Sequence, residues 1–290
     1  METTQNLNET RLADAWAELQ AHADQGNPLT ADAYRLAFAD PEFLLRRETR
    51  GIRFQLELLK PDLEQASRGI HNTIVVFGSA RFRSPEDAQH ELEHAQRGGD
   101  AQAIRKAQTA VRNAAYYEHA RTFARHVAQY SQRCPVKDQL YISTGGGPGI
   151  MEAANRGAHD VGAPTVGLNI ALPHEQQANP YVSPELSFKF HYFALRKMHF
   201  LMRAKALLAF PGGFGTLDEL FEVLTLVQCG KAKPVPIFLF GSDFWKRLIN
   251  FDVLVDEGTI SEADLKLFHY VDDPLQAWEG LRKFYQLPAV

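Results

Sequence analysis

The stretch that most constrains the fold of this chain runs from Ala206 to Lys231. Its first residues, Ala206–Phe210, form an apolar run that ends at Pro211 and has the length and composition of a buried strand. A glycine-rich turn follows, and apolar residues at helical spacing begin directly after it. A strand, a glycine turn and a helix start bring unpaired N–H groups and the positive end of a helix dipole to one point. The stretch therefore predicts an anion site, for which a phosphate is the natural ligand.

The turn is built from small residues. Gly212, Gly213 and Gly215 can adopt positive φ and place no side chain between a ligand and the backbone N–H groups. Thr216 and Glu219 have the spacing of a capping box, in which both side chains bond to the first N–H groups of the helix. Glu219 is equally a candidate catalytic carboxylate, and the two roles do not exclude each other.

Length and composition narrow the class of protein. The chain has 290 residues, which fits one large α/β domain or one domain with an appendage. A net charge of −4 and the lack of a basic run with interleaved aromatic residues argue against a nucleic-acid partner. Cys134 and Cys229 fit neither a disulfide framework nor a zinc spacing, which favours a reducing compartment. No signal peptide or membrane-length apolar window is visible, so we expect a cytoplasmic protein with no membrane partner.

Residues 1–70 contain helical patterns and no strand-like run, and we expect them to form an N-terminal helical extension. Trp16 and Leu19 share one face of a first helix, and residues 31–38 suggest a second. Residues 43–63 combine several arginines with an apolar face, as in a solvated or interdomain helix.

The first clear strand is Thr73–Phe77, which ends in a small-residue turn that contains Ser79. Such an ending is typical of the first strand in a doubly wound sheet, at the edge where ligands bind. Ser79 is therefore either a ligand contact or an ordinary turn or cap serine. Residues 85–131 are polar and helix-favouring with a glycine pair between two arms, which predicts an inserted helical hairpin.

A second strand, glycine turn and helix start occupy residues 139–158, with Gly146 inside the turn. One glycine cluster is weak evidence, because turns need glycine for steric reasons, but two in one α/β pattern are stronger. Neither cluster continues into the Lys-Ser or Lys-Thr of a P-loop, and neither matches the dinucleotide fingerprint. A nucleoside triphosphate or a dinucleotide is therefore disfavoured.

Strand-like runs alternate with helical segments through the chain. The strands are expected at residues 73–77, 139–144, 165–172, 189–193, 206–210 and 236–240, and the C-terminal tail is expected to be helical around residues 265–268 and 275–284. This alternation predicts an α/β fold, a Rossmann-like doubly wound parallel sheet with helices on both faces. Because ligands bind beyond the carboxyl ends of such strands, the turns at residues 78, 145 and 212 should lie along one crevice.

Basic residues precede the turn at Gly212. Arg196, Lys197 and Arg203 lie in a helical segment that leads toward this turn. Arginine forks suit a phosphate or a carboxylate, and an ordinary basic helix surface is the alternative.

His174 and Glu175 resemble the start of a zinc-binding HExxH motif. Ala178 stands where that motif needs its second histidine, so the zinc interpretation fails and we expect no metal.

Four motifs occur in a distinctive order: GGGPGIMEAANRGA at residues 145–158, PHEQ at 173–176, RK at 196–197 and PGGFGTLDEL at 211–220. In this order they resemble the Lonely Guy family of phosphoribohydrolases, which has often been labelled "possible lysine decarboxylase". The resemblance covers roughly residues 72–245.

The resemblance implies an enzyme of the phosphoribohydrolase or AMP nucleosidase type, with a Rossmann-like nucleotide-binding catalytic domain over residues 71–290. Such an enzyme hydrolyses the N-glycosidic bond of a nucleoside 5′-monophosphate to a free base and ribose 5-phosphate. The substrate would be AMP or a cytokinin riboside 5′-monophosphate. The resemblance also implies a homodimer or higher homo-oligomer, and no cofactor.

The resemblance places the family's catalytic glutamate on Glu219 and its arginine on Arg196. With the turn residues, the expected substrate-binding set is Ser79, Gly146, Glu175, Arg196, Lys197, Gly212, Gly213, Phe214, Gly215, Thr216, Leu217, Asp218, Glu219 and Thr225. Glu152 departs from the pattern, because many short members have a glycine there. The hairpin and the N-terminal helices are also additions to the short form.

This chemistry agrees with the residues themselves. Cleavage of a ribosyl–base bond passes through an oxocarbenium-like transition state, which a carboxylate such as Glu219 stabilises while it orients the attacking water. The N–H groups of residues 213–216 would hold the phosphate and so position the sugar. Arg196 would either hold Glu219 as an anion or bind the phosphate.

Other classes of protein remain as alternatives. A non-hydrolytic carrier of a nucleotide or of the molybdenum cofactor, with the same fold, would use similar glycine turns. A lysine decarboxylase is disfavoured, because no motif supplies the Schiff-base lysine and pyridinium partner that pyridoxal phosphate needs. A pure interaction scaffold would leave the two glycine turns and the basic segment unexplained.

Overall fold

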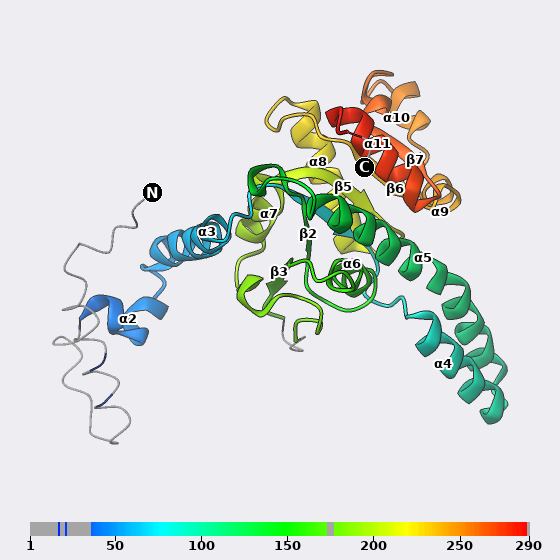
Figure 1. Ribbon diagram of the computed structural model, residues 1–290, viewed down its shortest axis with the longest axis horizontal. Coiled ribbons are helices and arrows are strands. Elements are labelled where there is room, and N and C mark those ends of the chain that lie inside the picture. The colour runs from blue at the N-terminus through cyan, green and yellow to red at the C-terminus, as the bar shows by residue number, and fades with distance from the viewer. Residues whose placement is uncertain (1–16, 18–20, 22–35, 173–176, 289–290) are drawn as a thin grey trace. The chain divides into compact units, whose positions relative to one another are not determined.

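The computed structural model describes residues 17, 21, 36–172 and 177–288 (Figure 1). The chain divides into two compact units, Met1–Glu57 and Leu58–Val290. Trp16, Leu19 and most of the helix expected at residues 31–38 lie outside the described residues. The assignment of residues 1–70 to an extension stays a prediction.

The described part of the first unit contains the 3₁₀ helix η2 (Ala37–Ala39), α2 (Pro41–Leu45) and the first turns of α3 (Arg50–Ser67). The expected helix over residues 43–63 is wrong in one respect, because it is broken between α2 and α3. At the break the hydroxyl of Thr49 lies within 3.0 Å of three backbone carbonyl oxygens at the end of α2. A local side-chain bond of this kind competes with continued helix.

The second unit is built on a sheet of seven parallel strands in the order β4-β3-β2-β1-β5-β6-β7. The strands are β1 (Thr73–Phe77), β2 (Tyr141–Thr144), β3 (Thr165–Ile170), β4 (Ser187–Phe190), β5 (Ala204–Ala209), β6 (Ile237–Phe240) and β7 (Phe268–Val271). This confirms the predicted Rossmann-like α/β fold. Strand order reverses between β1 and β5, which is where such folds bind ligands.

The last strand, β7, corrects the sequence prediction, which expected helix around residues 265–268. The short 3₁₀ helix η5 (Asp264–Leu267) ends there, and the next four residues pair with Ile237–Phe240 of β6. Four residues at the edge of a sheet carry too little periodicity to identify a strand, and the pairing with β6 decides their conformation.

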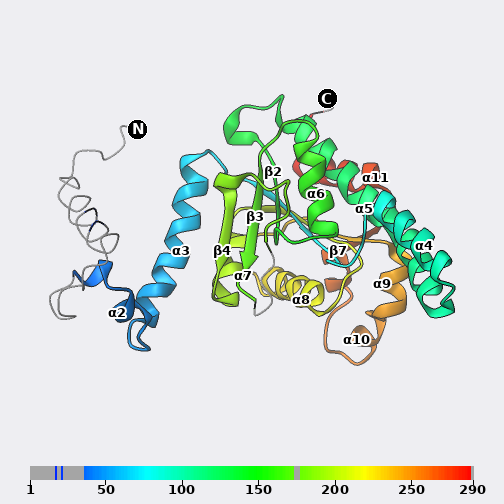
Figure 2. The ribbon, with the colours of Figure 1, turned by 90° about the horizontal axis from the view of Figure 1, so that it is seen from below.

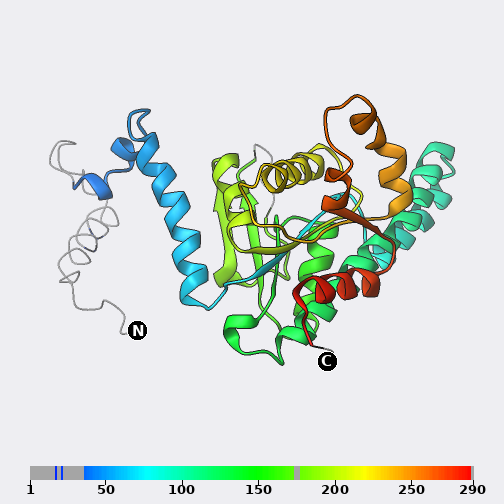
Figure 3. The ribbon, with the colours of Figure 1, turned by 90° about the horizontal axis from the view of Figure 1, so that it is seen from above.

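Helices cover both faces of the sheet (Figures 2 and 3). The helices that follow β1 are α4 (Pro85–Gly98), α5 (Ala101–Ser131), α6 (Ile150–His159), α7 (Phe193–Met202), α8 (Phe214–Gln228), α9 (Ser242–Leu248), α10 (Asp252–Asp256) and α11 (Pro274–Tyr285), and α4 packs on α5. Ile74 and Val76 of β1 pack with α5, α6 and α11, whereas Val75 and Phe77 pack with α7, α8 and α9. The alternation follows from the two-residue repeat of a strand. Among the described helices, none is both long enough and apolar enough to cross a lipid bilayer.

The predicted hairpin over residues 85–131 is confirmed as α4 and α5, whose free end lies away from the sheet (Figure 1). Gly99 closes α4 in the left-handed conformation, with φ of 73°. The second half of α5 is buried against α6. There Gly157 is needed for close approach, because a Cβ atom on it would lie 2.0 Å from the carbonyl oxygen of Arg121.

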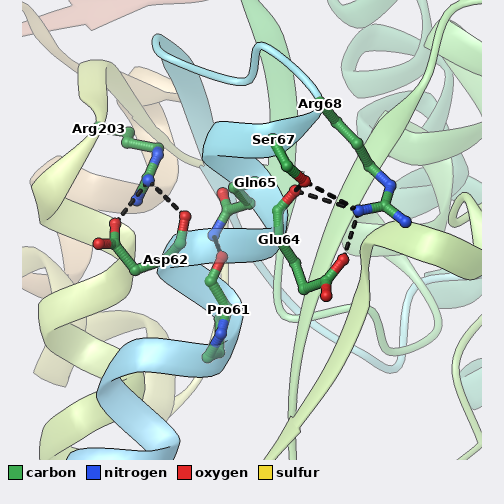
Figure 4. Close-up of polar contacts among 7 residues, drawn as sticks. All are labelled: Pro61, Asp62, Glu64, Gln65, Ser67, Arg68 and Arg203. Atoms are coloured by element: carbon green, nitrogen blue, oxygen red, sulfur yellow. Dashed lines mark hydrogen bonds and ion pairs between the residues drawn. The ribbon is translucent and has the colours of Figure 1, made fainter. Parts of the chain in front are cut away.

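Arg203 lies at the end of the sheet opposite to the glycine turn, so the expectation that it approaches the phosphate site is wrong. It immediately precedes β5, and its guanidinium bonds to the end of α3 instead (Figure 4). Nη2 donates to Oδ1 of Asp62 at 2.6 Å, and Nε donates to the carbonyl oxygen of Ile70 at 2.9 Å. The predicted helical segment that carries Arg196 and Lys197 ends at Met202, and this places Arg203 at the amino end of the strand.

Candidate active site

The carboxyl ends of β1, β2 and β5 enclose a cavity of about 630 Å³. Gly78, Gly145 and Gly212, one from each strand-end turn, all line it. The prediction that the three turns share one crevice is therefore confirmed. The volume falls in the usual range for small-molecule sites.

Helix α8 begins at the wall of this cavity without a side-chain cap. It starts at Phe214 with Gly213 as N-cap, three residues earlier than a capping box at Thr216 requires. The capping-box interpretation of Thr216 and Glu219 is therefore wrong. The N–H groups of Phe214, Gly215 and Thr216 lie in the first turn, where a helix offers them no acceptor.

The glycines of this turn do not adopt the left-handed backbone conformation. Their lack of a side chain instead lets other atoms come close to the backbone. Gly213 has φ of −93°, and neither Gly212 nor Gly215 adopts positive φ. A Cβ atom on Gly212 would lie 2.2 Å from Oγ1 of Thr216, so only glycine fits under the helix start. Gly213 and Gly215 face open space, and the backbone there is accessible to a ligand.

Ser79 lies in the turn after β1, and its contact with a ligand stays a prediction. It lines the cavity, and its Oγ accepts a hydrogen bond from the N–H of Arg81 at 3.1 Å. Its backbone joins the three turns, because its N–H donates to the carbonyl oxygen of Pro211 and its carbonyl oxygen accepts from the N–H of Ile150. Gly149, with φ of 74°, is required beside it, since a Cβ atom would lie 2.3 Å from the Ser79 oxygen.

Glu219 and Arg196 meet inside the cavity. Nη2 of Arg196 lies 3.3 Å from Oε1 of Glu219, and their side chains are 15% and 6% exposed. The guanidinium also lies 5.2 Å and 5.6 Å from the ring centroids of Phe193 and Phe200. Its buried Nε has no hydrogen-bond partner among the described residues. Arg196 is thus fixed by packing and by one carboxylate.

Burial sets the acidity of this pair. It raises the pKa of Glu219 to about 7 from an ordinary 4.5, while the positive charge of Arg196 opposes the shift. Burial likewise lowers the pKa of Arg196, and the Glu219 carboxylate opposes that change. A buried carboxyl group that titrates near neutral pH, inside a cavity, is typical of an active site.

Several expected site residues lie in a second depression of about 520 Å³ on the outer surface of α7 and α8. Lys197, Leu217, Asp218 and Thr225 line it. Nζ of Lys197 lies 2.8 Å from the carboxylate of Asp218 and 3.2 Å from that of Glu222. The structure therefore separates these residues from the main cavity.

Phe214 lines both hollows and is 90% exposed. It is the shared boundary between the main cavity and the second depression.

Gly146 and Glu175 complete the expected set. Gly145 lines the cavity, whereas Gly146 is turned toward Asn169, whose Nδ2 would lie 2.6 Å from a Cβ atom placed on it. The N–H of Gly146 donates to Oγ1 of Thr144. Glu175 lies outside the described residues, as do its neighbours from 173 to 176.

Other residues that line the cavity were not predicted. Arg81 and Phe82 follow the turn after β1, and the reasoning that selected Ser79 could have reached them. Phe82 stacks on Tyr116 of α5, with ring centroids 5.8 Å apart, so the hairpin supports one wall of the cavity. Phe244 comes from α9, and no local sequence signal marks it.

Glu152, the departure from the family pattern, has a partner in the hairpin. Its Oε1 accepts a hydrogen bond from the hydroxyl of Tyr117 at 2.8 Å. This hydrogen bond links the residue that departs from the family pattern to the inserted hairpin.

Comparison with known proteins tests the resemblance to the Lonely Guy family. Residues 151–281 match the family model described as "Possible lysine decarboxylase". The "Probable cytokinin riboside 5′-monophosphate phosphoribohydrolase LOG4" of Oryza sativa subsp. japonica is 30% identical over 142 residues, 48% of this chain and 60% of the relative. The "Cytokinin riboside 5′-monophosphate phosphoribohydrolase LOG" of the same plant is 34% identical over 122 residues, 41% of this chain and 49% of the relative. The resemblance to the Lonely Guy family is confirmed.

The match to these Lonely Guy proteins is partial, since the chain spans about half the length of the curated relatives it matches. Among solved structures, the one titled "X-ray structure of TM1055" has a TM-score of 0.46 and 19% identity, covering 73% of this chain and 99% of that one. The Moco carrier protein from Chlamydomonas reinhardtii has a TM-score of 0.43 and 18% identity, covering 74% and 98%. Likeness of this degree says nothing about function.

The raised pKa of Glu219 predicts a pH-dependent stability. Because the folded protein binds this proton more tightly than the unfolded chain, the contribution is full below about pH 4.5 and is lost as pH rises through about 7. From pH 5 to pH 8 we expect the wild type to lose up to about 3 kcal/mol in free energy of unfolding relative to Glu219→Gln, measured by urea denaturation. Glu222→Gln, on the same helix, should follow the wild type. Parallel curves for the wild type and Glu219→Gln would contradict the assignment.

Proposed function

We propose that this protein hydrolyses the N-glycosidic bond of a nucleoside 5′-monophosphate to a free base and ribose 5-phosphate. One observation carries the proposal: a buried carboxylate, Glu219, lies in the same cavity as the uncapped start of α8. Glu219 follows Phe214 by five residues, a rise of about 7.5 Å along the helix. A phosphate on the first N–H groups would then leave the anomeric carbon of the ribose near the carboxylate.

Glu219 would act in its ionised form. Its negative charge would stabilise the oxocarbenium-like transition state, and its oxygens would orient the attacking water. The dry surroundings that raise its pKa also strengthen its interaction with a developing positive charge. The phosphate contacts, remote from the reacting bond, would hold the sugar for attack.

Arg196 would pair with the carboxylate of Glu219 and would not bind the phosphate. Its guanidinium is 3.3 Å from the carboxylate and lies over two phenylalanine rings, so it has little freedom to reach another anion. Its positive charge lowers the pKa of Glu219 and so increases the ionised fraction at neutral pH.

The names of the curated relatives support a cytokinin riboside 5′-monophosphate as the substrate. AMP, which the family resemblance also implies, has the same ribose 5′-monophosphate and is the second candidate. They also favour hydrolysis over the carrier alternative, in which the same cavity would hold a nucleotide or the molybdenum cofactor unchanged. Lysine decarboxylation stays disfavoured on the residues present. No lysine is found among the described residues that line the cavity, and Lys197 is paired with two carboxylates outside it.

Replacing Glu219 by Gln should remove the reaction and leave the fold. The amide keeps the shape of the side chain but not its charge, so we expect adenine release from AMP to fall by about 10²- to 10⁴-fold. Chromatography of adenine and ribose 5-phosphate measures this, and Glu222→Gln is the matched control. Wild-type activity in Glu219→Gln would refute the catalytic role. Tight AMP binding without release by the wild type would instead indicate a carrier.

The role of Arg196 predicts a shifted pH profile. The value of kcat/KM for AMP should fall below about pH 7, where Glu219 becomes protonated. Arg196→Met should move this acid limb to higher pH, because the charge that lowers the pKa of Glu219 is gone. Lys197→Met, which removes a weaker influence on the same carboxyl group, should move it less. A large rise in KM with an unmoved limb would show that Arg196 binds the phosphate.

A homodimer is the second part of the proposal. Phe193, Met198 and Met202 of α7 are about half exposed, and Phe214 and Phe221 of α8 are also exposed. These two helices are joined by the ion pairs of Lys197, so the side chains lie on neighbouring elements. We expect light scattering to give twice the chain mass, and Met198→Lys to lower it. A monomer at all concentrations would contradict this part.

The cytoplasmic location stays a proposal, which cell fractionation tests.

A further inference from the structure

The cavity has two cations among its described lining residues, Arg81 and Arg196, and their surroundings differ. Arg196 is buried and paired with Glu219. Arg81 is exposed and has no carboxylate within ion-pair distance in the described part of the chain. Its positive charge is therefore available to a ligand.

The charge of a phosphate monoester exceeds what the rest of the site supplies. Such a group carries about −1.5 to −2 at pH 7. The start of α8 contributes roughly +0.5, and the ion pair of Arg196 with ionised Glu219 adds no net charge. Lys197 lies outside the cavity and is already shared by Asp218 and Glu222. The start of α6, whose Met151 also lines the cavity, adds a similar partial charge. One further cation would bring the site close to balance with the dianion.

Arg81 is held beside the helix start that would bind this phosphate. The turn that carries it is fastened to the turn before α8, because the N–H of Ser79 donates to the carbonyl oxygen of Pro211 at 3.0 Å. The backbone carbon of Gly78 lies only 3.2 Å from the position of a Cβ atom on Gly212. The N–H of Arg81 itself donates to Oγ of Ser79, which fixes the base of its side chain.

We propose that Arg81 is a substrate-binding residue whose guanidinium holds the 5′-phosphate from the side opposite to the N–H groups of α8. The planar fork of an arginine binds two phosphate oxygens at once, and its exposed side chain can close over a ligand that has entered. This inference rests on the proposed function, because it takes the phosphate to sit at the start of α8. It assigns the phosphate to Arg81 and leaves Arg196 to the carboxylate.

The test compares Arg81→Ala with Arg83→Ala. Arg83 is also exposed, lies two residues further on and does not line the cavity, so it is the matched control. We expect Arg81→Ala to raise KM for AMP by about 10- to 100-fold, as for a lost charge-assisted hydrogen bond, with kcat within a few-fold. Inhibition by inorganic phosphate should weaken similarly, whereas binding of adenosine should not change. Arg81→Lys should be intermediate, and Arg83→Ala should match the wild type.

Thermal unfolding of each variant shows whether it is folded, and Arg81→Lys carries the comparison where Arg81→Ala is not. Unchanged KM and unchanged phosphate inhibition in a folded Arg81 variant overturn the inference and leave the proposed function. Equal loss of AMP and adenosine binding also overturns it, since the arginine would then not act on the phosphate. A wild type that binds AMP without hydrolysis overturns the proposed function, and weaker AMP binding by Arg81→Ala would still support the inference.

Discussion

The reversal of strand order between β1 and β5 is the constraint on which the site depends. The helix after β2 packs on one face of the sheet and the helix after β5 packs on the other, so their starts diverge at the carboxyl edge. The space between them becomes the cavity. Gly78, Gly149 and Gly212 are needed where the turns touch, because Cβ atoms on them would lie 2.2–2.6 Å from neighbouring atoms. Sheet topology thus creates the crevice, and glycines keep it compact at its base.

The same geometry buries an ion pair. Taking Glu219 and Arg196 out of water costs free energy that their mutual attraction offsets only in part, as the raised pKa of the glutamate shows. Apolar residues in their place would pack against Phe193 and Phe200 at no such cost. The burial of this ion pair in a cavity is therefore better explained by chemistry at the site than by stability of the fold.

Sequence reasoning succeeded where a signal is local and failed where a tertiary contact decides. The strand Thr73–Phe77 and the three glycine turns were predictable, since apolar runs and glycine clusters act within a few residues. The start of α8 was misplaced, because Thr216 looks like a better cap than Gly213, and the site needs the uncapped start. Arg203 and β7 were misassigned because α3 and β6, remote in sequence, determine their positions.

The site residues predicted from the family resemblance lie partly in the main cavity and partly outside it, and helix geometry explains the division. Successive residues on a helix point about 100° apart, so Asp218 and Glu219 cannot both face the cavity, nor can Arg196 and Lys197. Arg196 pairs with Glu219 inside the cavity, and Lys197 pairs with Asp218 and Glu222 outside it. The outer ion pairs join α7 to α8 beside the inner pair. Residues of one motif can therefore contribute to one site in two ways, by lining the cavity and by fixing the helices that line it.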